Sequence, residues 1–135
     1  MTWRVQRIKF ITREYVRSNP DKLFLFGDNL ERRGFGGQAA AMRGEPNAIG
    51  IPTKKSPSNT ESAFFSDDEI ELNKAAIDAA FAGVLTAING VNRENQIITI
   101  PADGLGTGRA QLEKRAPKTF AFLLQKLAEL ETYLR

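Results

Sequence analysis

The chain has 135 residues, of which 41% are hydrophobic and 26% charged, a balance typical of one globular domain and not of a disordered segment. It contains no cysteine and no histidine, which excludes disulfides, thiolate or imidazole metal ligands, and catalysis by a cysteine nucleophile or a histidine base. We therefore expect a single domain over residues 1–135, with no metal and no cofactor. No apolar run approaches the roughly 18 residues of a membrane span, and residues 1–7 lack the apolar core of a signal peptide, so we expect a cytoplasmic protein without a membrane partner.

Charge is distributed unevenly along the chain. Residues 1–55 contain 11 Lys/Arg and 5 Asp/Glu, whereas the remaining residues contain 8 and 11, and the formal net charge is +3. A basic half indicates an anionic partner, which is a nucleotide phosphate, a nucleic acid or an acidic protein, with solvated surface charge as the alternative explanation. Most phenylalanines lie inside apolar runs and are not interleaved with the basic residues, which makes a surface for stacking single-stranded nucleic acid less favoured.

The first half of the chain alternates between strand and helix patterns. Partial alternation of apolar residues predicts a strand over 3–12, in which Trp3 serves as a core residue. The unbroken apolar run 23–26 predicts a strand buried on both faces. Residues 38–43 are typical of a short helix, and residues 48–51 of a strand that ends at Pro52.

The second half continues this alternation after a polar loop over 53–60. The sequence Ser66-Asp67-Asp68-Glu69 predicts the start of a helix, which Asn89-Gly90 ends. A buried strand is expected over 96–100, ended by Pro101, and a last helix carries Pro117 in its first turn. The fold class predicted from this order is α/β: a three-layer α/β/α domain with a mixed, largely parallel sheet.

Glycine-rich loops follow the two most strand-like apolar runs. The first spans 27–38 and leads into a helix, and the second spans 101–109. Glycines let backbone N–H groups approach an anion, and a helix N-terminus adds positive potential. Neither loop has the spacing of a P-loop or of a dinucleotide fingerprint, and tight turns are the alternative explanation for both.

Because parallel strands end at the same edge of a sheet, we expect the two loops to form one phosphate-binding cleft. Asp28 and Asn29 have side chains that could hydrogen-bond a ribose or a base. The expected ligand-binding residues are Asp28, Asn29, Gly34, Phe35, Gly36, Gly37, Gln38, Gly104, Leu105, Gly106, Thr107, Gly108 and Arg109.

Together these motifs resemble the macrodomain family over residues 23–130. The carrying residues are an Asn ahead of a glycine loop (Asn29, then Gly34-Phe35-Gly36-Gly37) and a strand ending in Pro101 before Gly104-Leu105-Gly106-Thr107-Gly108. The resemblance implies a macrodomain-like fold that binds ADP-ribose or a related nucleotide. It also implies, as a further possible partner, a macromolecule carrying ADP-ribose.

The run Ile51-Pro52-Thr53-Lys54-Lys55 is similar to that of a macrodomain branch that removes ADP-ribose from carboxylate side chains. The resemblance implies Lys54 as the nucleophile of an ADP-ribosyl glycohydrolase. For the catalytic carboxylate the chain offers Asp103 in the second loop, with Asp28 as the alternative. Repulsion from Lys55 is one way to lower the pKa of Lys54.

The chain departs from the macrodomain pattern at two places. Gly108 stands where that branch has its catalytic Asp, and residues 11–14 lack the Gly-Asp pair that binds adenine in the family, with Glu14 and Asp28 as candidate substitutes. Two alternative functions therefore stay open. One is a basic nucleic-acid-binding protein, and the other is a different nucleotide-cleaving α/β hydrolase that uses Glu31 or Asp103.

Overall fold

The computed structural model describes residues 3–90 and 96–134. Its strands form one sheet in the order β1-β4-β2-β3, and every pairing between them is parallel. The strands are β1 (Trp3–Ile8), β2 (Lys22–Asn29), β3 (Ala48–Lys54) and β4 (Gln96–Pro101). The α/β class is therefore confirmed, whereas the expected mixed sheet is corrected to a parallel one, beside which Lys54 and Phe64 form one isolated antiparallel bridge.

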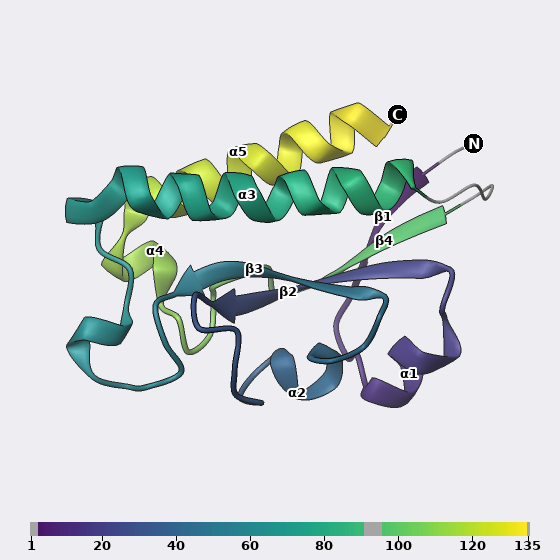
Figure 1. The fold of residues 1–135 in the computed structure, drawn as a ribbon, viewed down its shortest axis with the longest axis horizontal. Helices are drawn as coiled ribbons and strands as arrows, with labels where there is room; N and C mark the ends of the chain where they lie inside the picture. The colour runs from purple at the N-terminus through teal and green to yellow at the C-terminus, as the bar shows by residue number, and fades with distance from the viewer. Residues whose placement is uncertain (1–2, 91–95, 135) are drawn as a thin grey trace.

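Helices cover both faces of the sheet, which gives three layers (Figure 1). On one face lie α1 (Arg13–Ser18) and α2 (Ala39–Met42), and on the other lie α3 (Ile70–Asn89) and α5 (Pro117–Leu134). A short helix, α4 (Leu112–Arg115), precedes α5, and two 3₁₀ turns, η1 (Glu61–Ala63) and η2 (Asp67–Glu69), lie between β3 and α3.

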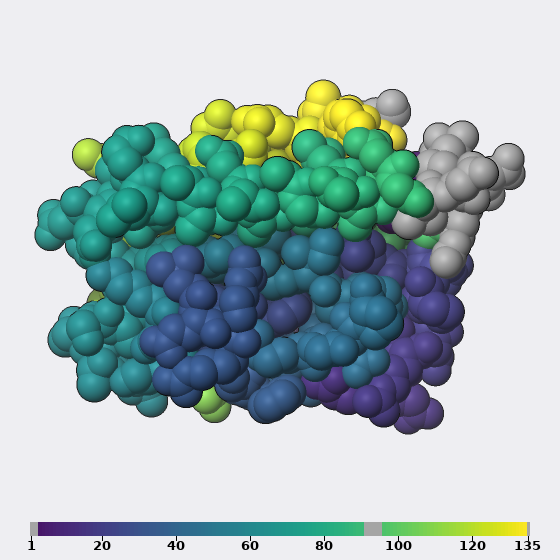
Figure 2. All heavy atoms as spheres, viewed as in Figure 1, coloured from purple at the N-terminus to yellow at the C-terminus, as the bar shows by residue number. Residues whose placement is uncertain are grey.

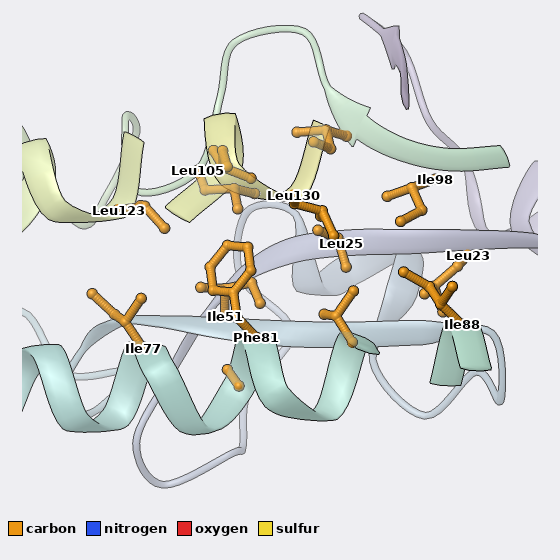
Figure 3. Packing of buried hydrophobic residues seen from close by; sticks show 14 of the residues in the cluster. Leu23, Leu25, Ile51, Ile77, Phe81, Ile88, Ile98, Leu105, Leu123 and Leu130 are labelled. Carbon is orange, nitrogen blue, oxygen red and sulfur yellow. The ribbon is translucent and has the colours of Figure 1, made fainter. Parts of the chain in front are cut away.

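Strand β2 supplies side chains to the hydrophobic cores on both faces. Leu23 and Leu25 pack with α3 and α5, as Figure 3 shows, while Phe24 and Phe26 pack on the opposite face against α1 and α2. Side chains of a strand point alternately to the two faces, so an unbroken apolar run suits a sheet that is covered on both. The prediction of a strand buried on both faces is confirmed, and Trp3 lies in the larger core as expected.

Several boundaries differ from those expected. Strand β2 continues past Phe26 to Asn29 and so includes the first residues of the expected glycine loop. Strand β1 ends at Ile8, and α1, which was not anticipated, begins after Thr12, whose side chain accepts a hydrogen bond from the backbone N–H of Tyr15. Strand β3 continues through Pro52 to Lys54. Proline cannot donate a backbone hydrogen bond, but β3 lies at the edge of the sheet, where such a residue is tolerated.

The order of the strands creates a switch point between β2 and β4. From β2 the chain continues to β3 on one side, while β4 pairs with β2 on the other side. In open parallel sheets ligands bind at the carboxyl ends of the strands beside such a point. Both glycine loops begin there.

None of the helices within residues 3–90 and 96–134 has the length and apolarity needed to cross a membrane.

The N-terminus of α5 is capped by a residue from a distant turn. The carboxylate of Asp67 accepts hydrogen bonds from the backbone N–H groups of Lys118 (2.9 Å) and Thr119 (3.0 Å) and from the Thr119 hydroxyl (2.8 Å). Burial opposes ionisation of Asp67, but these hydrogen bonds outweigh it and lower the pKa of Asp67 below its ordinary value. Ser66 caps the η2 turn and not α3 itself, so the predicted helix start is a 3₁₀ turn, after which α3 begins at Ile70.

Replacing Asp67 by Ala should lower the free energy of unfolding by about 1 kcal/mol at pH 7, because two backbone donors of α5 lose their acceptor. A lowered native pKa means that the contribution of Asp67 is fully present above about pH 4 and is lost as the pH falls through the native pKa. Urea denaturation of the wild type and of Asp67→Ala measures the loss of unfolding free energy at pH 7 and at pH 3, and the loss should be smaller at pH 3. Asp68→Ala is the control. Equal stability of the two variants at pH 7 would contradict the capping role.

Candidate functional site

A pocket of about 240 Å³ lies at the carboxyl ends of the strands, between the loop that follows β2 and the loop that follows β4. In the space-filling view the loop after β2 (dark blue) lies on the surface below α3 (Figure 2). The pocket is lined by Gly27, Asp28, Asn29, Arg33, Gly34, Phe35, Gly36, Gly37, Gln38, Ala39, Arg43, Thr53, Lys54, Pro57, Gly106, Gly108, Arg109 and Ala110.

A buried ion pair lies at the base of the first loop. The carboxylate of Asp28, with only 2% of its side chain exposed, pairs with the guanidinium groups of Arg43 and Arg32. Residue 50 on the neighbouring strand is a glycine, and a Cβ at this position would collide with the Asp28 side chain. The absence of a side chain at Gly50 therefore leaves the space that the carboxylate occupies. The carboxylate of Asp28 thus neutralises two arginines, although the sequence suggested that it would contact a ligand.

Three side chains hold the first glycine loop in place. Arg43 donates to the carbonyl of Gly34 (2.6 Å), and the Asn29 amide donates to the carbonyl of Arg33 (2.9 Å). The side-chain amide of Gln38 accepts from the backbone N–H of Gly27 (2.7 Å) and donates to the carbonyl of Gly104 (2.8 Å). Because Gly104 belongs to the second loop, Gln38 connects the two loops.

The second loop packs closely behind the pocket. Gly106 has a φ of +76°, and a Cβ there would lie 3.0–3.1 Å from atoms of Thr53 and Leu112, so only glycine fits without strain. The guanidinium of Arg109 lies across the first loop, where a Cβ on Gly36 would come within 2.6 Å of its Nη1 atom. The two loops therefore face each other at contact distance.

The pocket walls contain backbone and side-chain groups without hydrogen-bond partners. Among the lining residues that the structure describes, the backbone N–H groups of 34–37 and of Gly106, Gly108 and Arg109 make no hydrogen bond within the protein. Asn29 is 7% exposed, and its side-chain oxygen Oδ1 is buried with no partner. Buried polar atoms are nearly always paired, so the lone Oδ1 atom of Asn29 is unusual. The N–H groups of the loops belong mostly to exposed residues and are open to an acceptor from solution.

Lys54 is a buried amine at the end of β3. It is 7% exposed, and its Nζ atom donates to the carbonyl of Ser58 (2.8 Å) and lies 4.6 Å from the centre of the Phe64 ring. Burial, and then the positive charges of Arg109 and Arg115, lower the pKa of Lys54 below its ordinary value. Lys55 pairs with Glu69, so the repulsion attributed to Lys55 from the sequence comes instead from two arginines of the second half.

Positive charge predominates around the pocket. Four lining residues are cationic (Arg33, Arg43, Lys54 and Arg109), and Asp28 is the only acidic residue among the described side chains that line it. The described part of the chain holds no group of three carboxylates able to bind a metal ion. This arrangement favours a small anion or a phosphorylated molecule.

The structure brings most of the expected site residues together, but not all. Asp103 is exposed and does not line the pocket, so it is not placed with Lys54. Leu105 lies in the hydrophobic core, Gly104 and Thr107 lie outside the pocket, and the other expected residues line it. Sequence reasoning overlooked Arg43, Thr53 and Pro57 as lining residues. In the sequence, Arg43 is the last residue of the helix predicted over 38–43. The one signal for its ion pair with Asp28 is that a single loop separates this helix from the strand that ends near Asp28.

Residues 6–126 match the model of a family of unknown function, DUF7831. The chain belongs to this family. The match includes both glycine loops, the Asp28–Arg43 pair and Lys54. No curated protein and no solved structure matches the chain.

In this DUF7831 member, Arg43→Met should lower the free energy of unfolding by about 3 kcal/mol, because it removes the better buried of the two partners of Asp28. Chemical denaturation measures the change. The control is Arg7→Gln, which breaks an exposed ion pair with Glu131 and should cost less than about 1 kcal/mol. A loss for Arg43→Met no larger than for the control would show that the buried pair does not stabilise the fold.

Proposed function

We propose that the pocket binds ADP-ribose or a closely related nucleotide, with its phosphates between the two glycine loops. The support is a single combination of features: free N–H groups on two facing loops, a surplus of cationic side chains, and the unpartnered oxygen of Asn29. Phosphate oxygens accept hydrogen bonds from such loops, and a ribose hydroxyl can donate to Asn29.

Phe35 adds a feature that suits a nucleotide. Its ring is 65% exposed, although it belongs to a loop that lines the pocket, and an exposed aromatic ring can stack on a base or cover a ribose. The resemblance of the two loops to those of macrodomains favours ADP-ribose among nucleotides. The macrodomain-like fold remains part of this proposal.

The two alternative functions have less support in the structure. Nucleic-acid binding requires unpaired cations along a surface, yet Arg7, Arg13, Arg17 and Arg32 of the basic half form ion pairs with carboxylates. A different nucleotide-cleaving hydrolase requires a free carboxylate in the pocket. Asp28 is neutralised by arginines, and Glu31 pairs with Arg33.

Isothermal titration should show saturable binding of ADP-ribose that is tighter than that of AMP, ATP or NAD. Asn29→Ala should weaken binding about tenfold, because each hydrogen bond to a buried group contributes about 1 kcal/mol or more. Asn59→Ala, which alters an exposed asparagine, is the control. Equal affinity of Asn29→Ala and wild type would contradict the role of Asn29, and absence of heat with all four nucleotides would contradict the proposed ligand.

A second function is the removal of ADP-ribose from a modified macromolecule. The observation that favours it is the burial of Lys54, together with the lowered pKa of its amine. A neutral amine can attack the anomeric carbon: a bond forms from Nζ to that carbon as its bond to the departing carboxylate breaks. Water then releases the sugar and regenerates the amine. Because Asp103 lies outside the pocket, protons must pass to and from solvent in this scheme.

Lys54→Ala should lower turnover of a glutamate-linked mono-ADP-ribosyl protein at least 100-fold while the affinity for free ADP-ribose changes less than about fivefold, as expected for loss of a nucleophile. Lys55→Ala, which removes the neighbouring lysine that pairs with Glu69, should retain turnover. Release of ADP-ribose from the labelled protein provides the measurement. Unchanged turnover in Lys54→Ala would exclude the nucleophile and leave the binding proposal intact.

A further inference from the structure

Phe64 contacts two cations, Lys54 and Arg115. The centre of its ring is 4.6 Å from Nζ of Lys54 and 3.7 Å from the guanidinium carbon of Arg115. Phe64 itself is 7% exposed and is joined to Lys54 by the antiparallel bridge. Arg115 thus covers the aromatic side chain against which the amine packs.

Arg115 is held in this position from two sides. Its Nε atom donates to the side chain of Gln111 (3.0 Å), and its Nη1 atom donates to the carboxylate of Glu61 (2.8 Å). Gln111 has a φ of +47°, a strained conformation for a residue other than glycine. Glu61 is almost fully exposed, with 87% of its side chain accessible, so it can be changed without disturbing the core.

The ring of Phe64 would by itself favour the charged form of a nearby amine, because the face of an aromatic ring attracts cations. Arg115 lies closer to the ring centre and is always charged, so it takes the greater part of this attraction. Its positive charge then disfavours a second charge on Lys54. The positive charge of Arg115 therefore opposes protonation of the amine.

The other charged groups around Lys54 do not reverse this effect. Arg109 from the second loop adds to the repulsion. Arg33 and Arg43 also line the pocket, and the carboxylate of Asp28 is already paired with arginines. On the η1 side the carboxylate is Glu61, which partly neutralises Arg115, while Lys55 is neutralised by Glu69.

We propose that Arg115 is a positioning residue for Lys54: stacked on Phe64, it fixes the ring against which the amine packs and opposes a second positive charge beside it, and the exposed Glu61 moderates this effect. The proposal rests on the proposed function only in taking Lys54 as the reactive group. It identifies a regulatory ion pair at the surface, Glu61–Arg115, that acts on the site through one aromatic ring.

The test measures the pH dependence of Lys54 reactivity without any nucleotide. Brief labelling with acetic anhydride between pH 6 and 10, followed by mass spectrometry with fragmentation that resolves Lys54 from Lys55, gives the apparent pKa of the amine. The variants are Arg115→Met, which keeps a long apolar side chain against Phe64, Arg115→Lys, which keeps the charge, and Glu61→Gln. Lys114→Met is the matched control, since Lys114 is an exposed cation on the same short helix.

Arg115→Met should raise the apparent pKa of Lys54 by about half a unit to one unit, as expected for removing one charge near a partly shielded amine, and should slow labelling at pH 7.5 about three- to tenfold. Glu61→Gln should lower the apparent pKa, and Arg115→Lys and Lys114→Met should leave it near the wild-type value. Wild-type profiles for both Arg115→Met and Glu61→Gln would overturn the proposal. If Arg115→Met does not fold, the Glu61→Gln profile decides alone. If Lys54 of the wild type shows the pH profile of an ordinary lysine, the assumption that its amine is reactive is wrong, and the proposal fails with it. Failure of ADP-ribose binding would contradict the proposed function alone, because the labelling contains no nucleotide.

Discussion

The buried pair of Asp28 and Arg43 is the interaction on which the candidate site depends. A carboxylate with 2% exposure at the end of a central strand is tolerated only where cations and hydrogen bonds neutralise it. Arg43 supplies this charge from the end of α2 and also donates to the carbonyl of Gly34. One guanidinium therefore connects the strand, the glycine loop and the short helix that follows the loop. Gly50 on the neighbouring strand leaves the space that this arrangement needs.

The same pair determines the charge of the pocket. Asp28 is occupied by two arginines and Arg33 pairs with Glu31, so among the described residues the lining cations Lys54 and Arg109 have no carboxylate partner, and the loop N–H groups face an electropositive space. Loops and side chains of this kind are suited to a phosphate, which is the ligand proposed above. Burial and the positive charges of Arg109 and Arg115 also lower the pKa of Lys54. The proposed phosphate site and the proposed nucleophile thus draw on one electrostatic arrangement in this DUF7831 member.

Local patterns predicted much of the fold, because they report burial directly. The run 23–26, the Ser66 cap and the position of Pro117 all correspond to observed elements. The helix over 13–18 was missed because its six residues contain one buried side chain, Val16, too few to show a period. The extension of β3 through Pro52 depends on the strand's place at the sheet edge, which is a property of the tertiary structure.

The glycine loops could be found from composition, but the roles of individual side chains could not. Asp28, Lys55 and Leu105 each have a plausible ligand or catalytic chemistry in the sequence, and the structure gives them an ion pair with arginines, an ion pair with Glu69 and a place in the core. These outcomes depend on residues far away in the chain. Arg115, which contacts Phe64, illustrates the same limit, since nothing in its own surroundings in the sequence relates it to Lys54.

A one-residue irregularity in the sheet determines which side chains meet in the pocket. The register between β2 and β3 shifts after Asp28, so that Asn29 lies opposite Lys54, while Thr53 is left unpaired and donates from its hydroxyl to the carbonyl of Asp28 (3.2 Å). Residues opposite each other on adjacent strands project to the same face. Without the shift, Asn29 would oppose Thr53, and the unpartnered amide oxygen and the buried amine would lie on opposite faces. The bulge therefore places the unpartnered oxygen of Asn29 and the buried amine of Lys54 on the same face of the sheet.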